Sequence, residues 1–593
     1  MNSKKPIRFA HSTIRNLYSL KPYFVRHKAK IAVGLTCLLT VDLLQLFIPR
    51  IIKTAIDELT LQTASTKSLL EYGLAIVAIA LVVGVLRYIW RHLIFGHSRV
   101  VERDLRYRLF EHLQKLSLNF FSRTRTGDLM ARSTNDMEAV RFAVGMGLVA
   151  VNDGIIMGLS AIAFMLYINV KLTLIALIPM PAIIFASRFL TMRMHALFQK
   201  VQETFADLTE RSRESITGIR VVQAYRLEEW EEQRLRDMGD RYISENIQLG
   251  RTMAMFFPMM MLFTNLSLTV VLWLGGRMTI LKGISIGDFV AFISYLNLLT
   301  WPMMALGWVT NLIQRGSVSM GRINRLLEER PEIEDKGPGA PPTPIAGEVE
   351  VRGLSFRYPD EDRYILRDLS FKIEAGSTVV LVGRTGSGKT TLVHLLTRLL
   401  EPSRNSIFLE NIPIHEWPLS ALRSSVAVAP QDPFLFSDTV SANLLFGRTG
   451  YDDEWIQTCL NTADLSNDVK QFQRGLETMT GEKGLTLSGR QRQRLALARA
   501  LIDNPPILIL DNALSMVDTA TERRILDQMA PLRRGKTNIW ISHRVSTIRK
   551  AERILVLDEG RVVEQGTHEE LIRAGNVYPS IYQRALLSER LEG

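Results

Sequence analysis

A glycine-rich run, GRTGSGKTT at 383–391, has the residue types and spacing to bind phosphate. It follows the apolar run STVVLV and precedes the helical run LVHLLTRLL, the strand–loop–helix context that a phosphate-binding loop needs. Three glycines, Gly383, Gly386 and Gly388, would let backbone N–H groups curl around phosphate oxygens. Lys389 would neutralise the β and γ oxygens, so the run predicts a nucleotide site.

Two oxygen-bearing side chains predict a Mg²⁺ site at the same place. Thr390 follows the lysine, and Asp511 ends the apolar run PPILIL, where a Walker-B carboxylate is expected. We therefore expect ATP and Mg²⁺ as cofactors. A phosphate loop alone does not distinguish a kinase from a motor, a GTPase or a transporter.

The elements that must position these residues are predicted in a soluble domain at 346–593. Short β-rich runs alternate there with helical patterns, which indicates an α/β domain with a mostly parallel sheet. The runs are VEVRGLSFRY, TVVLVG, VAVAPQ, PILILD, NIWISH and RILVLDEG. Residues 317–345 precede this domain and end in KGPGAPPTP, a Pro/Gly-rich linker pattern.

Six apolar stretches before the linker are long enough to span a membrane, which takes about 20 residues. They are residues 31–52, 69–95, 139–168, 171–190, 253–276 and 286–313. We expect an all-α transmembrane domain at 31–316. Short links and long charged links alternate, so the short links would lie outside and the long ones inside, and six spans return the chain to the cytoplasm.

The long charged links have helical patterns of their own. Residues 97–116 and 195–215 could continue the membrane helices into the cytoplasm by roughly 30 Å each. Breaks follow at 120–130 and 215–230, where short transverse helices could lie. The alternative is that these segments are solvated loops.

Composition agrees with a hybrid of membrane and soluble parts. The mean hydropathy of the 593 residues, +0.08, is too high for an ordinary soluble chain and too low for membrane spans alone. The composition excludes a disordered or collagen-like chain. The two cysteines, Cys37 and Cys459, lie far apart in unlike surroundings, so they predict neither a disulfide framework nor a cysteine metal site.

A basic segment at 1–30 accounts for much of the net charge of +12. It contains eight basic residues and no acidic ones: Lys4, Lys5, Arg8, Arg15, Lys21, Arg26, Lys28 and Lys30. The segment leads straight into the first apolar stretch, which favours a cytoplasmic flank held by the positive-inside rule. A nucleic-acid partner is disfavoured because no nucleic-acid module follows, and a signal peptide because the apolar run is too long.

An ordered set of motifs after the phosphate loop resembles the nucleotide-binding domain of ABC transporters. It comprises VAPQD with Gln431, TLSGRQRQRLALARAL at 486–501, SMVD at 515–518 and ISHR with His543. With six preceding spans, the resemblance covers nearly the whole chain. It implies a half-transporter of the type IV exporter class, multi-pass in a bacterial inner membrane, with its amino terminus and ATP-binding domain cytoplasmic.

The resemblance also implies roles for single residues. Tyr358 would stack on adenine, Gln431 would touch Mg²⁺ and the attacking water, and His543 would lie near the γ-phosphate. Ser488 and Gly489 would close over a nucleotide bound by another subunit, with Asp518 in the adjoining D-loop. The further expected nucleotide contacts are Arg384, Thr385, Ser387, Thr391, Arg490 and Gln491.

Two departures from the family pattern bear on catalysis. Asn512 stands where a Glu usually follows the Walker-B aspartate, and an amide positions water without accepting its proton. Loss of a general base typically costs about 10²–10⁴ in rate, so this site should bind ATP and hydrolyse it poorly. Arg490 replaces a signature glycine and adds charge beside the opposing nucleotide, with an effect that the sequence leaves open.

These departures favour a heterodimer. A homodimer would place Asn512 in both ATP sites, whereas a partner half-transporter could supply a Glu for one competent site. FFSRTRTGDLMARSTND, RYIWRHLIFG and WPMMALGWVTNLIQRGS resemble MdlA-type subunits of heterodimeric bacterial multidrug exporters. The alternatives are a homodimeric exporter of lipid or peptide, and a mainly regulatory subunit that clamps ATP.

Polar and methionine residues within the spans are candidates for contact with a hydrophobic or amphipathic substrate, drug or membrane lipid. The polar ones are Asp42, Asn152, Asp153, Asn265 and Asn297. Bonding between helices is an equally good explanation for them. Met255, Met259, Met260, Met261, Met303 and Met304 suit an adaptable pocket or simple packing.

Overall fold

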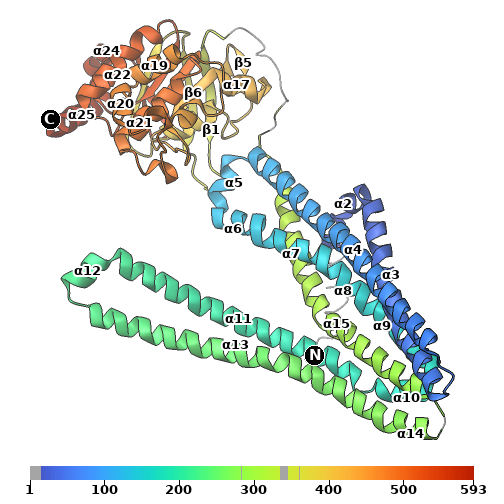
Figure 1. The fold of residues 1–593 in the computed structure, drawn as a ribbon. Coiled ribbons are helices and arrows are strands. Elements are labelled where there is room, and N and C mark those ends of the chain that lie inside the picture. The colour runs from blue at the N-terminus through green and yellow to red at the C-terminus, as the bar shows by residue number, and fades with distance from the viewer. Residues whose placement is uncertain (1–14, 282, 334, 336–344, 360, 593) are drawn as a thin grey trace. The chain divides into compact units, whose positions relative to one another are not determined.

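The computed structural model describes residues 15–281, 283–333, 335, 345–359 and 361–592. The chain divides into two compact units. One takes in the residues up to Gln114 and Thr126–Glu329, and the other Lys115–Arg125 and everything from Arg330 onward. Figure 1 colours both along the chain.

The first unit is helical throughout and contains six helical stretches long and apolar enough to cross a membrane. They are α3 (Lys28–Thr60), α4 (Thr66–Lys115), the series ending in α9 (Gly158–Ile168), α10 (Val170–Ala176) with α11 (Met180–Thr217), α13 (Glu228–Val270) with α14 (Gly276–Ile280), and α15 (Ile286–Leu327). The predicted all-α six-span domain is confirmed. A break at Leu177–Pro179 divides the fourth stretch, next to Pro179 and Pro181, because proline lacks a backbone donor.

Both predicted extensions are continuous helix. Helices α4 and α11 run past their apolar parts without a break to Lys115 and Thr217. Helices α11 and α13 lie side by side along their length, and the short helix α12 (Ile219–Ala224) joins their ends (Figure 1). At 120–130 the chain forms two short helices, α5 (Leu118–Arg123) and α6 (Thr126–Ala131), in place of a single transverse one.

Polar bonds tie the first span to the third and the sixth. Asn152 donates to the buried carboxylate of Asp42 at 3.0 Å. Asp57 on α3 accepts from the Ser285 hydroxyl at 2.9 Å and from the Gly287 amide at 2.8 Å, at the start of α15. Asp42 and Asn152 therefore bond between helices, which was the alternative to a substrate contact in the sequence analysis. Met260 is buried, whereas Met255 and Met261 are exposed.

The second unit contains the predicted parallel sheet, in the order β10-β9-β3-β8-β7-β6. Strands β3 (Thr378–Gly383), β6 (Val426–Ala429), β7 (Ile507–Asp511), β8 (Thr537–Ile541) and β9 (Arg553–Asp558) are parallel, and β10 (Arg561–Gly566) pairs antiparallel with β9. Every residue of β7 and β8 is buried, as in a sheet covered on both faces. The predicted α/β domain is confirmed.

A second, four-stranded sheet was not predicted. It has the order β2-β1-β4-β5, made of β1 (Val349–Phe356), β2 (Leu366–Ile373), β4 (Ile407–Leu409) and β5 (Ile412–Pro413). The run VEVRGLSFRY therefore forms an antiparallel strand outside the parallel sheet. A β-rich run predicts a strand but does not say which partner the strand will take.

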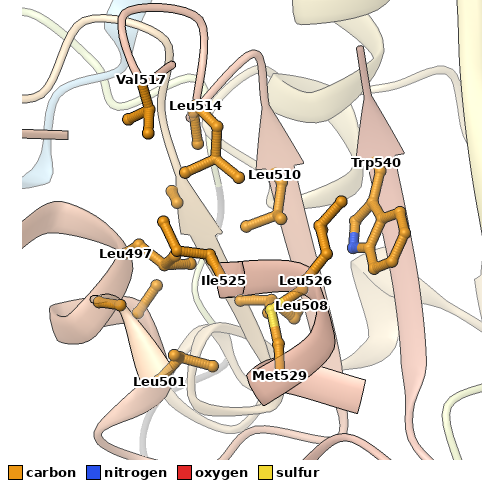
Figure 2. Packing of buried hydrophobic residues seen from close by; sticks show 14 of the residues in the cluster. Leu497, Leu501, Leu508, Leu510, Leu514, Val517, Ile525, Leu526, Met529 and Trp540 are labelled. Atoms are coloured by element: carbon orange, nitrogen blue, oxygen red, sulfur yellow. The ribbon is translucent and has the colours of Figure 1, made fainter. Parts of the chain in front are cut away.

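A buried apolar cluster packs two helices against the six-stranded sheet. Figure 2 shows Leu497 and Leu501 of α21 (Gly489–Leu501) and Ile525, Leu526 and Met529 of α22 (Thr519–Leu532) around Leu508, Leu510 and Trp540 of β7 and β8. Each fully buried leucine contributes about 1.5–3 kcal/mol. The cluster thus holds the amino ends of α21 and α22, which carry Ser488 and Asp518.

Candidate nucleotide-binding site

The loop between β3 and α16 (Lys389–Leu396) requires glycine at two positions. A Cβ at Gly383 would lie 2.1 Å from the Leu557 carbonyl oxygen. Gly388 has a φ of +96°, and a Cβ there would lie 2.5 Å from Leu366 Cδ2. Close approach and left-handed backbone therefore explain why the loop has glycine at these points.

Lys389 folds back onto its own loop. Its ammonium donates to the carbonyl oxygens of Gly383 at 2.8 Å and Arg384 at 2.9 Å, and lies 3.3 Å from the Ser387 hydroxyl. The side chain is 7% exposed, and burial lowers its pKa although Asp511 acts in the opposite direction. A buried cation held by three neutral oxygens is suited to an incoming anion.

Asp511 presents a carboxylate oxygen that fits a metal ion. The residue ends β7 and is 3% exposed, and Oδ1 has no hydrogen-bond partner among the described residues. Burial raises the pKa of Asp511, while a hydrogen bond from Thr390 and the nearby His394 and Lys389 lower it. A buried, unsatisfied carboxylate oxygen beside the Thr390 hydroxyl matches the ligands that Mg²⁺ prefers, so the residues present fit that ion.

A cavity of about 970 Å³ brings most of the predicted site residues together. Its lining includes Tyr358, Gly383, Arg384, Thr385, Gly386, Gly388, Lys389, Thr390, Thr391, Gln431, Asn512 and His543. Ser387 is buried within the loop, and the buried Asp511 is hydrogen-bonded to Thr390. The volume is at the upper end of the usual range for ligand pockets, roughly 300–1,000 Å³.

Tyr358 is fixed at the cavity wall. Its hydroxyl lies 3.2 Å from the Thr391 hydroxyl on α16, and its ring packs edge-on against Phe356 with centroids 5.3 Å apart. A half-buried aromatic ring tied to the phosphate-loop helix can accept a planar base on its free face.

Asn512 and His543 lie on adjoining parts of the wall. The backbone N–H of Asn512 donates to the Ile541 carbonyl oxygen at 3.0 Å. The φ angle of Asn512, +46°, is left-handed, a conformation in which asparagine is enriched. His543 keeps an exposed surface, yet partial burial lowers its pKa and the Lys389 ammonium acts in the same direction. The Asn512 side-chain amide cannot accept a proton from water, so it cannot act as a general base.

A second group of predicted residues lies outside the cavity lining. Ser488 caps α21 and exchanges side-chain and backbone hydrogen bonds with Gln491. Arg490 lies 3.9 Å from Asp518, which caps α22 by accepting from the Thr521 amide at 2.9 Å. That backbone bond is the first cause of a lowered pKa at Asp518. This signature cluster, Ser488–Gln491 with Asp518, is not part of the lining of the cavity that contains the chain's own phosphate loop.

Sequence reasoning missed part of the cavity wall. The helix α25 (Tyr578–Glu592) contributes Ile581, Arg584, Ala585 and Glu589, and β8 and α22 contribute Trp540 and Leu526. These residues belong to no motif, and their distance in sequence from residue 383 gave no signal. Only packing of the helices on the sheet brings them to the cavity.

Comparison with known proteins places both units in one family. Residues 31–303 match the ABC transporter transmembrane region, and residues 366–515 match the ABC transporter model. The chain is 35% identical over 575 residues to the probable multidrug resistance ABC transporter ATP-binding/permease protein YheI of Bacillus subtilis (strain 168), covering 97% of each chain. It is 34% identical over 581 residues to the multidrug resistance-like ATP-binding protein MdlA of Escherichia coli (strain K12), covering 98% of each.

A solved structure agrees with these relatives. The structure of a bacterial Atm1-family ABC exporter with ATP bound superimposes with a TM-score of 0.75 at 28% identity, covering 94% of this chain and 98% of that one. The likeness extends over membrane and ATP-binding parts together.

Proposed function

The chain belongs to the ABC transporter family, whose members are multi-pass membrane ATPases, and from this we propose that it is one half of a bacterial exporter paired with a different half-transporter. ATP binding drives export of a hydrophobic or amphipathic substrate. The site formed by this chain's own phosphate loop holds ATP and hydrolyses it slowly.

Asn512 is the observation that carries this proposal. It lines the cavity directly after Asp511, where a general base would face the nucleotide, and its amide cannot take a proton from water. A second such site in a homodimer would leave no base at all. A partner with a glutamate at this position restores one competent site, closed by the Ser488–Asp518 side of this chain.

The remaining residues have complementary tasks in this scheme. Lys389 and the loop amides hold the phosphates, and Thr390, Asp511 and Gln431 hold Mg²⁺, which neutralises phosphate charge when bound. Tyr358 stacks on adenine, a contact worth about 1–3 kcal/mol. His543, neutral at pH 7 because its pKa is lowered, donates to the γ-phosphate.

Export of apolar molecules across the inner membrane is supported by two features. The basic residues around α2 (Lys21–Arg26) and the start of α3 favour a cytoplasmic amino terminus, and six spans would then return the chain to the same side before the ATP-binding domain. The names of relatives point to drugs and lipids, among them an ATP-dependent lipid A-core flippase of Chromohalobacter salexigens that is 33% identical over 82% of this chain.

The test compares ATP hydrolysis by the full chain alone with hydrolysis by the complex captured with the tagged chain from its native membrane. We expect the chain alone to be slow and the complex to be brisk. Asn512→Glu should raise hydrolysis by the chain alone by about 10²–10⁴. The matched control is Asn512→Gln, which keeps an amide and should give no gain.

Brisk hydrolysis by the wild-type chain alone, unchanged by Asn512→Glu, would refute the slow site and favour a homodimeric exporter. Crosslinking of substrate to the fifth and sixth spans would support direct transport, whereas ATP occlusion without any substrate-dependent change would favour the regulatory role.

A further inference from the structure

One buried glutamine connects helix α21, which begins at the signature cluster, with residues that line the cavity. Gln493 lies on α21, five residues after the cap Ser488, and is 1% exposed. It lies within the run at 486–501, but the sequence assigned it no role, and it does not line the cavity. Its amide is bonded to two segments that are far apart in the sequence, one at Gln431 and one at Ser515–Met516.

Every bond that Gln493 makes goes to a segment of the nucleotide site. Its Nε2 donates to the Gln431 backbone carbonyl at 3.2 Å and to the Ser515 hydroxyl at 2.9 Å, while its Oε1 accepts from the Met516 amide at 2.9 Å. Two donors and one acceptor of a single side chain are thus used. A buried amide with this set of partners fixes their separation.

Ser515 extends the connection to the segment that carries His543. Its amide donates to the Asn512 carbonyl at 3.1 Å, and its carbonyl accepts from Arg544 Nη2 at 2.9 Å. Arg544 also pairs with Glu522 at 2.7 Å, and Glu522 is 1% exposed and accepts from Thr547. One hydrogen-bonded chain therefore runs from Gln431 through Gln493 and Ser515 to Arg544.

We infer that Gln493 is a positioning residue that transmits nucleotide occupancy from this chain's own cavity to its signature cluster. Gln431 and Ser515, to which the Gln493 side chain is bonded, line the cavity, whereas Ser488 caps the helix α21 that carries Gln493 and lies outside the cavity lining. The inference rests on the proposed function, in which the signature cluster closes the partner's site.

Two substitutions separate the bonds of Gln493. Gln493→Met keeps the shape and removes all three bonds. Gln493→Glu keeps an acceptor for the Met516 amide and the Ser515 hydroxyl, and loses the donor to Gln431. A protonated glutamic acid regains that donor, so activity of Gln493→Glu relative to wild type should recover as pH falls from 8 to 6. A side chain that only filled space would not respond in this way.

The experiment measures ATP hydrolysis and ATP binding by the captured complex, per folded molecule. We expect Gln493→Met to lower kcat by about tenfold to 10²-fold, as small displacements of a reacting geometry do, with KM within about twofold. The control is Asn538→Leu, which removes a buried amide bonded to Arg533, Thr378 and Lys536 at the start of β8, outside the cavity lining. It should lower the melting temperature and leave kcat unchanged.

Wild-type kcat in both Gln493 variants, or an equal loss of kcat in Asn538→Leu, would overturn the inference. Failure of the proposed function is read separately, from brisk hydrolysis by the wild-type chain alone. In that event the Gln493 variants are compared on the chain alone, and their ratio to wild type still decides the inference.

Discussion

The cavity and the signature cluster occupy the same domain but are built in opposite ways. In the cavity, Lys389 and Asp511 are almost fully buried before any ligand arrives, at 7% and 3% exposure. In the signature cluster, the side chains of Arg490 and Asp518 are 62% and 48% exposed. The buried Lys389 and Asp511 are placed to bind an anionic phosphate and a cation, respectively. The exposed Arg490 and Asp518 remain available for contact with another protein surface.

The largest expected difference comes from adding one methyl group to the phosphate loop and one to the signature cluster. Gly388→Ala should destabilise the domain by about 2–5 kcal/mol, because left-handed backbone costs about 1–2 kcal/mol and overpacking against Leu366 about 1–3 kcal/mol. Gly489→Ala meets only the flexible sulfur of Met516, at 2.7 Å, and should cost less than about 1 kcal/mol. Melting curves of the full chain with and without ATP measure both, and equal losses would contradict the contrast.

The second contrast concerns ATP affinity. Lys389→Met removes charge-assisted bonds worth about 1.5–3 kcal/mol and should weaken ATP binding to this chain about 10- to 100-fold. Lys536→Met is the control. The Lys536 ammonium donates to the Asn504 carbonyl oxygen at 2.8 Å, and the residue does not line the cavity. Fluorescent-nucleotide titration measures affinity, and unchanged binding in Lys389→Met would refute the assigned role.

As pH falls, the stability that depends on His394 and His543 should be lost before the stability that depends on Asp518 of the signature cluster. Burial lowers the pKa of His394 and partial burial that of His543 below the usual 6.5, so the unfolded chain binds more protons and stability falls as pH drops below 6.5. The bond from Thr521 lowers the pKa of Asp518 below 3.8, so its contribution persists until pH falls further.

Melting temperature measured between pH 8 and 5 tests this order. The double variant His394→Gln, His543→Gln should flatten the fall, while Asp518→Asn should not change its slope. Asp511 acts in the opposite sense, because burial raises its pKa, and it is retained in every variant. An unaltered slope in the double histidine variant would count against the histidines.

The smallest effect on stability is expected at Arg490. An exposed pair at 3.9 Å contributes at most about 1 kcal/mol, so Arg490→Gly should leave the melting temperature nearly unchanged. Hydrolysis by the complex is then measured, and a changed kcat places Arg490 at the partner's nucleotide. A melting loss as large as that of Gly388→Ala would mean that Arg490 is part of the fold.

Local pattern was sufficient to predict the six spans, the long extensions of α4 and α11, and the strands that end at Gly383 and Asp511. Apolar length and glycine spacing act within a few residues, so they can be read from the chain itself. The antiparallel sheet was missed because partner choice depends on contacts between β1 and the distant β4. The contribution of α25 to the cavity was missed for the same reason, because it depends on contacts between residues far apart in the sequence.

By itself, the sequence determined the chemistry: the phosphate loop around Lys389, the carboxylate at Asp511 and its uncharged neighbour Asn512 follow from residue type and spacing. Only the tertiary structure decided which of these groups act together. It brought Gln431, Asn512 and His543 to one cavity, left Ser488 and Asp518 outside it, and bonded Gln493 of α21 to Gln431 and Ser515 of the cavity lining. Hydrogen bonds between segments more than 20 residues apart exist only after the sheet and its helices have packed, because packing alone sets those distances.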